Sequence, residues 1–173
     1  MVLEKVGNVP ETIPDVIVPA SPADYFEVMT RAVFQAGVRW KQIAEQWDAY
    51  RLAFAEFDPG RVAAYDALDV ERVLATAGIL RMPKKVNAAI RNARALLETE
   101  REFGSLAAYL RSFDSYAALT KDFKKRFSLM GEMSVWYFLF RTGEPVPRFE
   151  AWVTTIPGEH PRMREMVERA RRA

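Results

Sequence analysis

The sequence contains no cysteine and a single histidine, His160. Without cysteine there is no disulfide framework and no thiolate ligand for a metal, and one histidine is too few for a histidine-based metal site. We therefore expect no metal and no other cofactor. The chain also lacks a run of 18 apolar residues and an apolar signal core near Met1, so the sequence predicts a cytoplasmic protein without a membrane partner.

The length and the apolar content predict one ordinary domain. The chain has 173 residues, of which 50% are hydrophobic, enough to form one substantial core. Four prolines, at positions 10, 14, 19 and 22, interrupt the first 22 residues. Because proline and the residue before it disfavour helix, we expect residues 1–22 to form an extended arm and residues 23–173 to form a single domain.

Apolar residues recur at helical spacing through most of the chain, and no segment alternates as a strand does. The pattern therefore predicts an all-α protein built from short helices. The expected helices run from Asp24 to near Gly37, open again at Trp40, and cover residues 62–68, 70–77, 86–99, 106–113, 116–127, 132–141 and 161–173.

The formal net charge is only +2, but the basic residues are clustered. Residues 81–94 hold five basic and no acidic side chains, and residues 118–127 hold four basic side chains with Asp122 as the one acid. These two segments would face a polyanion. The final segment, residues 161–173, predicts an amphipathic basic helix, which either docks with a solvated charged face or contacts DNA.

Four blocks of sequence occur in a specific order: FQAGVRW at 34–40, AFAEFD at 53–58, AGILR at 77–81 and KVNAAIRNA at 85–93. In this order they resemble the DNA-3-methyladenine glycosylase I family over roughly residues 25–143. The resemblance implies a bundle of the helix-hairpin-helix DNA glycosylase type. It also implies an enzyme of base-excision repair, acting as a monomer on double-stranded DNA, that flips and hydrolytically releases an alkylated purine such as 3-methyladenine.

Within the first block, the resemblance assigns base binding to Gln35, Gly37 and Trp40. An indole face attracts a cationic alkylated base, an amide reads the edge of the base, and a glycine lets the backbone turn tightly. Considered without the family, a tryptophan near a glycine is usually core packing.

The segment from residue 119 to the aromatic residues 136–138 resembles the DNA-binding hairpin of that family. A glycine turn there presents N–H groups at a helix N-terminus to a phosphate. Glu132 departs from the family pattern and would repel a phosphate, and the basic cluster is also typical of a solvated helix end. The expected DNA-binding residues are Lys121, Lys124, Lys125, Arg126, Ser128, Gly131 and Met133.

The catalytic carboxylate expected from the wider superfamily is Glu150, 19 residues after Gly131; the alternative is an exposed loop glutamate. Other family features are missing. Ala32 occupies the place of the adenine-reading glutamate, and the aromatic N-terminal motif and the zinc ligands have no counterpart. Two rival hypotheses follow: a catalytically impaired relative that binds DNA or a repair partner without turnover, and a helical interaction module with no nucleic-acid role.

Overall fold

The computed structural model describes residues 13–173, and this part of the chain contains helices and no strand. The all-α class predicted from the sequence is confirmed. None of the helices in this part combines the length and apolar character needed to span a lipid bilayer. The elements are α1 (Pro22–Gln35), α2 (Trp40–Glu45), α3 (Trp47–Ala53), η1 (Ala55–Phe57), α4 (Pro59–Ala63), α5 (Ala67–Ala75), α6 (Pro83–Phe103), α7 (Leu106–Leu110), α8 (Tyr116–Arg126), α9 (Glu132–Arg141), α10 (Phe149–Trp152), η2 (Val153–Thr155) and α11 (Pro161–Arg172).

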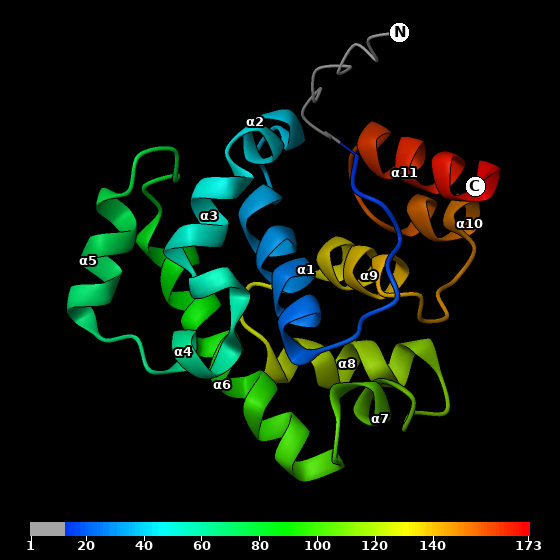
Figure 1. The fold of residues 1–173 in the computed structure, drawn as a ribbon. Coiled ribbons are helices and arrows are strands. Elements are labelled where there is room, and N and C mark those ends of the chain that lie inside the picture. The colour runs from blue at the N-terminus through cyan, green and yellow to red at the C-terminus, as the bar shows by residue number, and fades with distance from the viewer. Residues whose placement is uncertain (1–12) are drawn as a thin grey trace, which may run out of the picture.

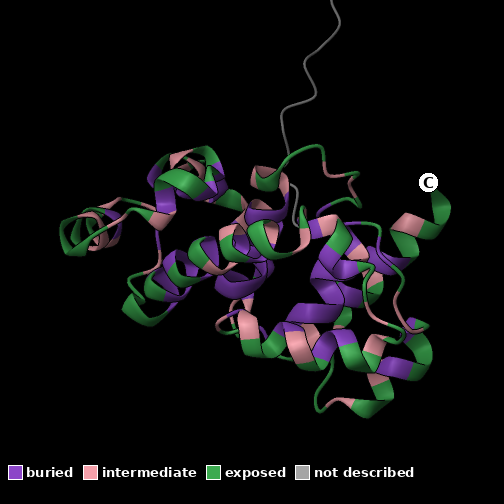
Figure 2. Ribbon diagram, turned by 90° about the horizontal axis from the view of Figure 1, so that it is seen from below, coloured by how far each residue is buried: buried purple, intermediate pink, exposed green. Residues whose placement is uncertain are grey.

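Helix α1 lies at the centre and packs against both α6 and α9 (Figure 1). Helices α2 to α6 lie on one side of it, and α7 to α11 lie on the other. Phe26 and Val33 of α1 and Phe138 of α9 are fully buried. The buried residues gather where the helices face one another (Figure 2), so burial of apolar side chains between α1, α6 and α9 is the main force that holds the two halves together.

Residues 13–20 contain no helix and cross the C-terminal end of α9 and the side of α11 (Figure 1). The amide of Ile17 donates to the carbonyl oxygen of Arg141 at 2.7 Å, and Arg141 Nε donates to the carbonyl oxygen of Asp15 at 3.0 Å. The Asp15 carboxylate lies 2.9 Å from Arg169 of α11. The first 12 residues of the expected arm lie outside the described residues, so the division into arm and domain remains an expectation.

The helix expected over residues 62–68 is wrong, because α4 ends at Ala63 and α5 begins at Ala67. Asp66 caps the second of these helices: its side chain accepts from the amides of Leu68 and Asp69 at 3.0 and 3.1 Å. An N-cap residue has extended backbone and cannot continue a preceding helix. The apolar spacing over residues 62–68 therefore comes from two separate short helices.

The helix α3 and the turn η1 were not predicted from the periodicity. Ala55, Glu56 and Phe57 have φ of 52°, 55° and 59°, in the left-handed region. This conformation costs roughly 1–2 kcal/mol for each non-glycine residue. Phe57 stacks on Trp47, with ring centroids 5.2 Å apart, and on Phe54 at 6.3 Å. Burial of these rings offsets the strain. Because the rings meet only through tertiary packing, the periodicity of the sequence does not predict this turn.

Candidate functional site

The loop between α1 and α2 carries the three residues expected to bind a base. Gln35 is the last residue of α1, Gly37 has φ of 72°, and Trp40 is the first residue of α2. The buried Lys85 of α6 fixes this loop, since its Nζ donates to the carbonyl oxygens of Phe34 at 2.9 Å and Ala36 at 2.7 Å. Burial lowers the pKa of Lys85. An ammonium group at the C-terminal end of a helix also complements the helix dipole.

A cavity of about 590 Å³ opens beside this loop. One wall comes from residues 35–41, another from the first turn of α9, and a third from the segment that leads into α11. The structure thus brings Gln35, Gly37, Trp40 and Met133 of the expected site residues together. The lining residues are Gln35, Gly37, Val38, Arg39, Trp40, Lys41, Met133, Glu159, His160, Pro161, Arg162 and Met163.

Gln35 lines this cavity and carries a buried amide oxygen without a hydrogen-bond partner. Its side chain is 4% exposed, and Oε1 has no hydrogen-bond partner in the structure. A buried polar atom without a partner costs about 1–3 kcal/mol. Rotation of the amide toward the cavity would let an N–H group of a bound ligand remove that cost.

Trp40 is both a core residue and a cavity residue. It is 8% exposed, and its ring meets that of Tyr137 edge to face, with centroids 5.4 Å apart and an interplanar angle of 76°. This packing holds the indole in one orientation. The cavity therefore receives a small but rigid part of the Trp40 ring.

The charged groups around the cavity include one carboxylate, that of Glu159. Within residues 13–173, no side chain forms an ion pair with Glu159. Lys41 pairs with Glu45 at 3.7 Å and Arg162 with Glu165 at 2.6 Å, so each of these two cations has a partner outside the lining set. Arg39 remains as a further cation on the rim.

Glu159 and the neighbouring His160 were not predicted from the sequence as site residues. Both follow η2, far along the chain from Gln35, and only the docking of α11 brings them to the cavity. His160 Nε2 lies 3.0 Å from the carbonyl oxygen of Pro157, which orients the imidazole ring. The sequence feature that marks this segment is its single histidine. A lone histidine does not indicate which residues it contacts in the fold.

The second group of expected residues lies on the hairpin formed by α8, residues 127–131 and α9. Gly131 is the N-cap of α9, and Leu129 has φ of 55° in the turn. The turn is held by α6: Ser128 N donates to Asn92 Oδ1 at 2.6 Å, and Asn92 Nδ2 donates to the carbonyl oxygen of Ser128 at 3.1 Å. Arg91 Nε donates to the Ser128 hydroxyl at 3.1 Å.

The N-terminus of α9 has no side-chain cap. In contrast, Ser115 Oγ accepts from the amide of Ala118 at the start of α8. The first amides of a helix have no acceptor within the helix, so those of α9 are available to an external one. Glu132, which would repel a phosphate here, forms an ion pair with Lys124 across the hairpin, and this pairing reduces the repulsion.

The basic residues of α8 do not all serve the same surface. Lys121, Lys124 and Lys125 line a second cavity beside the hairpin. Arg126 instead binds two carboxylates, with Nε 2.6 Å from Asp122 and NH1 2.8 Å from Glu102. These carboxylates raise the pKa of Arg126. Arg126 therefore joins α8 to α6, and the structure does not bring it to the lysines' cavity.

Glu150 lies on α10 and lines neither of these two cavities. Its carboxylate accepts from Arg171 NH2 at 3.0 Å and from Arg148 Nε at 3.2 Å. The hydrogen bond from Arg171 is the largest cause that lowers the pKa of Glu150, to about 2. The structure thus places this residue in an ion-pair cluster between α10 and α11.

The donor set does not fit the zinc ion that the resemblance implies. The chain has no cysteine and one histidine. Across residues 13–173, no three histidine, aspartate or glutamate side chains are grouped as metal ligands. The segment around Asp15 contacts α9 and α11 directly. These contacts join the N-terminal end of the described chain to its C-terminal helix.

Comparison with known proteins gives a consistent family. A model of the methyladenine glycosylase family matches residues 18–136. DNA-3-methyladenine glycosylase 1 of Escherichia coli (strain K12) is 39% identical over 88 residues, which cover 51% of this chain and 47% of that protein. DNA-3-methyladenine glycosylase of Haemophilus influenzae is 31% identical over 88 residues, 51% of this chain and 48% of that protein. The chain spans about half the length of the curated relatives it matches.

Solved structures agree with these matches. The 3-methyladenine DNA glycosylase I of Staphylococcus aureus superposes with a TM-score of 0.65 at 26% identity, covering 73% of this chain and 79% of that one. A solution structure of a 3-methyladenine DNA glycosylase I gives a TM-score of 0.59 at 29% identity, with 76% and 80% covered. The cavity wall at Glu159 lies beyond the residues that the family model matches.

Proposed function

The chain belongs to the methyladenine glycosylase family, and we propose that it is a DNA N-glycosylase of base-excision repair. It would flip an alkylated purine such as 3-methyladenine out of double-stranded DNA and release it by hydrolysis. The observation that carries this proposal is the Gln35 amide, buried and unpartnered at Oε1, in a cavity of about 590 Å³ shared with Trp40. Ligand sites commonly have volumes of roughly 300–1,000 Å³.

The cavity chemistry suits an alkylated adenine in the flipped position. Gln35 Oε1 would accept a hydrogen bond from the amino group of the base, which satisfies the buried acceptor. A purine alkylated at a ring nitrogen in DNA carries a positive charge. The Trp40 ring attracts such a charge more strongly than it attracts a normal base. Glu159, which also lines the cavity, would balance the same charge.

Release of the base needs little help from strong acids or bases. The bond between C1′ of the sugar and the purine nitrogen breaks, and its electron pair neutralises the cationic base. Water then adds to C1′ and loses a proton, leaving an abasic site. A nearby carboxylate stabilises the developing positive charge on the sugar. Glu150 stays the prediction from the sequence for this role, and the cavity geometry favours Glu159.

Binding to the DNA backbone is assigned to the hairpin. The uncapped amides at the α9 N-terminus would hold one phosphate, and Lys121 and Lys125 would contact others. Such contacts set the position of the protein on DNA and carry no sequence information. Recognition of the lesion would then reside in the cavity at Gln35 and Trp40.

One observation favours a second candidate, a relative that binds DNA without turnover. Ala32, where the resembling enzymes have a glutamate, is an apolar residue 2% exposed. If Glu159 does not supply the missing negative charge, the protein loses its main means of distinguishing a cationic alkylated base from a normal one. Release of 3-methyladenine from methylated duplex DNA under single-turnover conditions separates the two candidates, because only the enzyme releases free base.

A further inference from the structure

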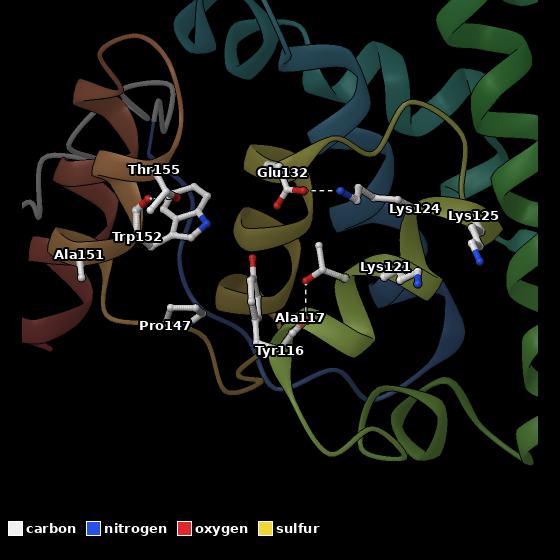
Figure 3. Close-up of a pocket in the computed structure, with 11 residues that line it drawn as sticks. Tyr116, Ala117, Lys121, Lys124, Lys125, Glu132, Pro147, Ala151, Trp152 and Thr155 are labelled. Carbon is white, nitrogen blue, oxygen red and sulfur yellow. Dashed lines mark hydrogen bonds and ion pairs between the residues drawn. The ribbon is translucent and has the colours of Figure 1, made fainter.

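A second cavity, of about 710 Å³, opens between α8 and the α10–η2 segment (Figure 3). It lies on the other side of the first turn of α9, since Glu132 lines it while the next residue, Met133, lines the cavity of Gln35. The uncapped amides of α9 therefore lie between the two cavities. The lining residues are Tyr116, Ala117, Thr120, Lys121, Lys124, Lys125, Glu132, Pro147, Ala151, Trp152 and Thr155.

The residues that line this cavity include several polar and basic groups. The indole nitrogen of Trp152 points into it (Figure 3), and no residue of the described chain accepts from that N–H. The Tyr116 hydroxyl is buried without a hydrogen-bond partner, and burial raises the pKa of Tyr116 to about 12. Lys121 and Lys125 line the α8 side of the cavity with ammonium groups that point away from Trp152 (Figure 3), and neither forms an ion pair within residues 13–173. A ligand rich in acceptors and carrying negative charge would satisfy these groups.

The floor of the cavity is aromatic and rigid. Trp152 stacks on Trp136 with centroids 4.9 Å apart and planes at 20°, and Trp136 stacks on Phe140 at 5.0 Å and 12°. Trp152 is the end ring of this column and is 6% exposed. Stacking and burial hold Trp152 in one orientation, so the part of the residue that reaches the cavity is small and fixed.

We propose that this cavity binds one unstacked nucleotide of a DNA strand, with its base against Trp152 and Tyr116 and its phosphate at Lys121 and Lys125. Proteins that hold single strands combine aromatic platforms with a basic groove in this way. An acidic peptide shares part of this chemistry. The nucleotide is favoured because the cavity adjoins the hairpin that the proposed function, on which this inference rests, places on the DNA backbone.

The relative position of the two cavities gives the nucleotide a place in the strand. A flipped base in the cavity of Gln35 and a phosphate at the α9 N-terminus direct the same strand toward the second cavity. The second nucleotide would come from the strand that flanks the lesion. Bending of the duplex at the lesion leaves such a neighbour partly unstacked.

The test uses the full chain and two matched variants, Ala117→Glu and Ala118→Glu. Both positions are exposed on α8 and each variant adds one negative charge, but only Ala117 lines the cavity. Fluorescence anisotropy measures binding to a blunt duplex and to the same duplex with a 3′ or a 5′ single-stranded tail. One tailed duplex should bind the wild type about tenfold more tightly than the blunt one. Ala118→Glu should keep that preference and Ala117→Glu should lose it.

Equal affinities of the wild type for all three duplexes would overturn the assignment, as would an equal loss of the preference in both variants. Displacement of the tail by an acidic peptide, and not by a single strand, would assign the cavity to a protein partner and also overturn it. Melting followed by circular dichroism verifies that both variants are folded. Base release is measured on the same preparations: a tail preference without release refutes the glycosylase function alone, and release without a tail preference refutes the cavity assignment alone.

Discussion

Asn92 of α6 forms two hydrogen bonds with the main chain of Ser128, accepting from its amide at 2.6 Å and donating to its carbonyl oxygen at 3.1 Å. The same helix carries Lys85, which binds the carbonyl oxygens of Phe34 and Ala36 beside the cavity of Gln35. One rigid helix thus sets the positions of both the loop between α1 and α2 and the hairpin. In the proposed function, this arrangement would fix the distance between a flipped base and its phosphate contacts.

Replacing Asn92 with alanine should loosen the hairpin. The variant leaves the partly buried amide and carbonyl of Ser128 without partners, so the free energy of unfolding should fall by about 1–3 kcal/mol. Affinity for duplex DNA should fall as well. Urea unfolding and fluorescence anisotropy measure the two effects. Asn92→Asp is the matched control, because it keeps the acceptor for Ser128 N and should retain more of the affinity; unchanged stability and affinity in both variants would refute the role of this contact.

Trp40→Phe should reduce release of alkylated base while leaving affinity for undamaged duplex unchanged. The phenyl ring retains much of the contact with Tyr137, whereas Trp40→Ala would also destabilise the fold by about 3–5 kcal/mol. A smaller ring gives a weaker cation–π attraction, so the loss should appear in single-turnover release. Equal losses of release and of affinity for undamaged DNA would contradict the assignment of Trp40 to the base.

Lys125→Ala should reduce the salt dependence of DNA binding. Each phosphate contact contributes about one unit to the slope of log affinity against log salt concentration. Arg101→Ala removes one exposed charge from α6, away from both cavities, and serves as the control. If the two variants give the same slope as the wild type, Lys125 does not contact a phosphate.

Glu159→Gln should slow release of the cationic base by about tenfold to a hundredfold, the loss expected when a hydrogen bond to a charged group is removed. Glu168→Gln, an exposed change on α11, should have no effect. The variant Glu150→Gln decides between the two carboxylates. A large loss in Glu150→Gln with none in Glu159→Gln would return the catalytic role to the residue predicted from the sequence.

Glu150 should also give the fold a pH-dependent stability. Its pKa in the folded protein is about 2, below the ordinary value of 4.5, mainly because of the hydrogen bond from Arg171. The stabilisation is therefore fully present above about pH 4.5 and is lost as the pH falls through 2. The difference in unfolding free energy between wild type and Glu150→Gln should shrink over that range. A difference that stays constant would show that the ion pair does not form in solution.

The sequence was sufficient for the fold class and for the family, because helical periodicity and the block FQAGVRW at 34–40 are local features. The helix Glu132–Arg141 was predicted with the bounds that the structure shows. The break at Asp66 was missed because the apolar period continues through it. The strained turn at Ala55–Phe57 is stable only through rings that come from elsewhere in the chain.

The candidate site could be predicted only in part, because some of its residues are brought together by tertiary packing. Gln35, Gly37 and Trp40 are near neighbours in the chain, so one motif indicates all three. Glu159 reaches the cavity through the docking of α11, and the pairing of Glu132 with Lys124 depends on the hairpin geometry. Glu150 was selected by its separation from Gly131, and spacing along the chain does not determine which cavity a side chain faces.

The most direct test of the glycosylase function is single-turnover release of free 3-methyladenine from methylated duplex DNA by the wild type and by Trp40→Phe, with Glu168→Gln as a control. A glycosylase that holds the base at Trp40 should release it in the wild type and the control, and more slowly in Trp40→Phe at equal affinity for undamaged DNA. Binding of duplex DNA with no release by the wild type would contradict the glycosylase function and establish a relative that binds without turnover.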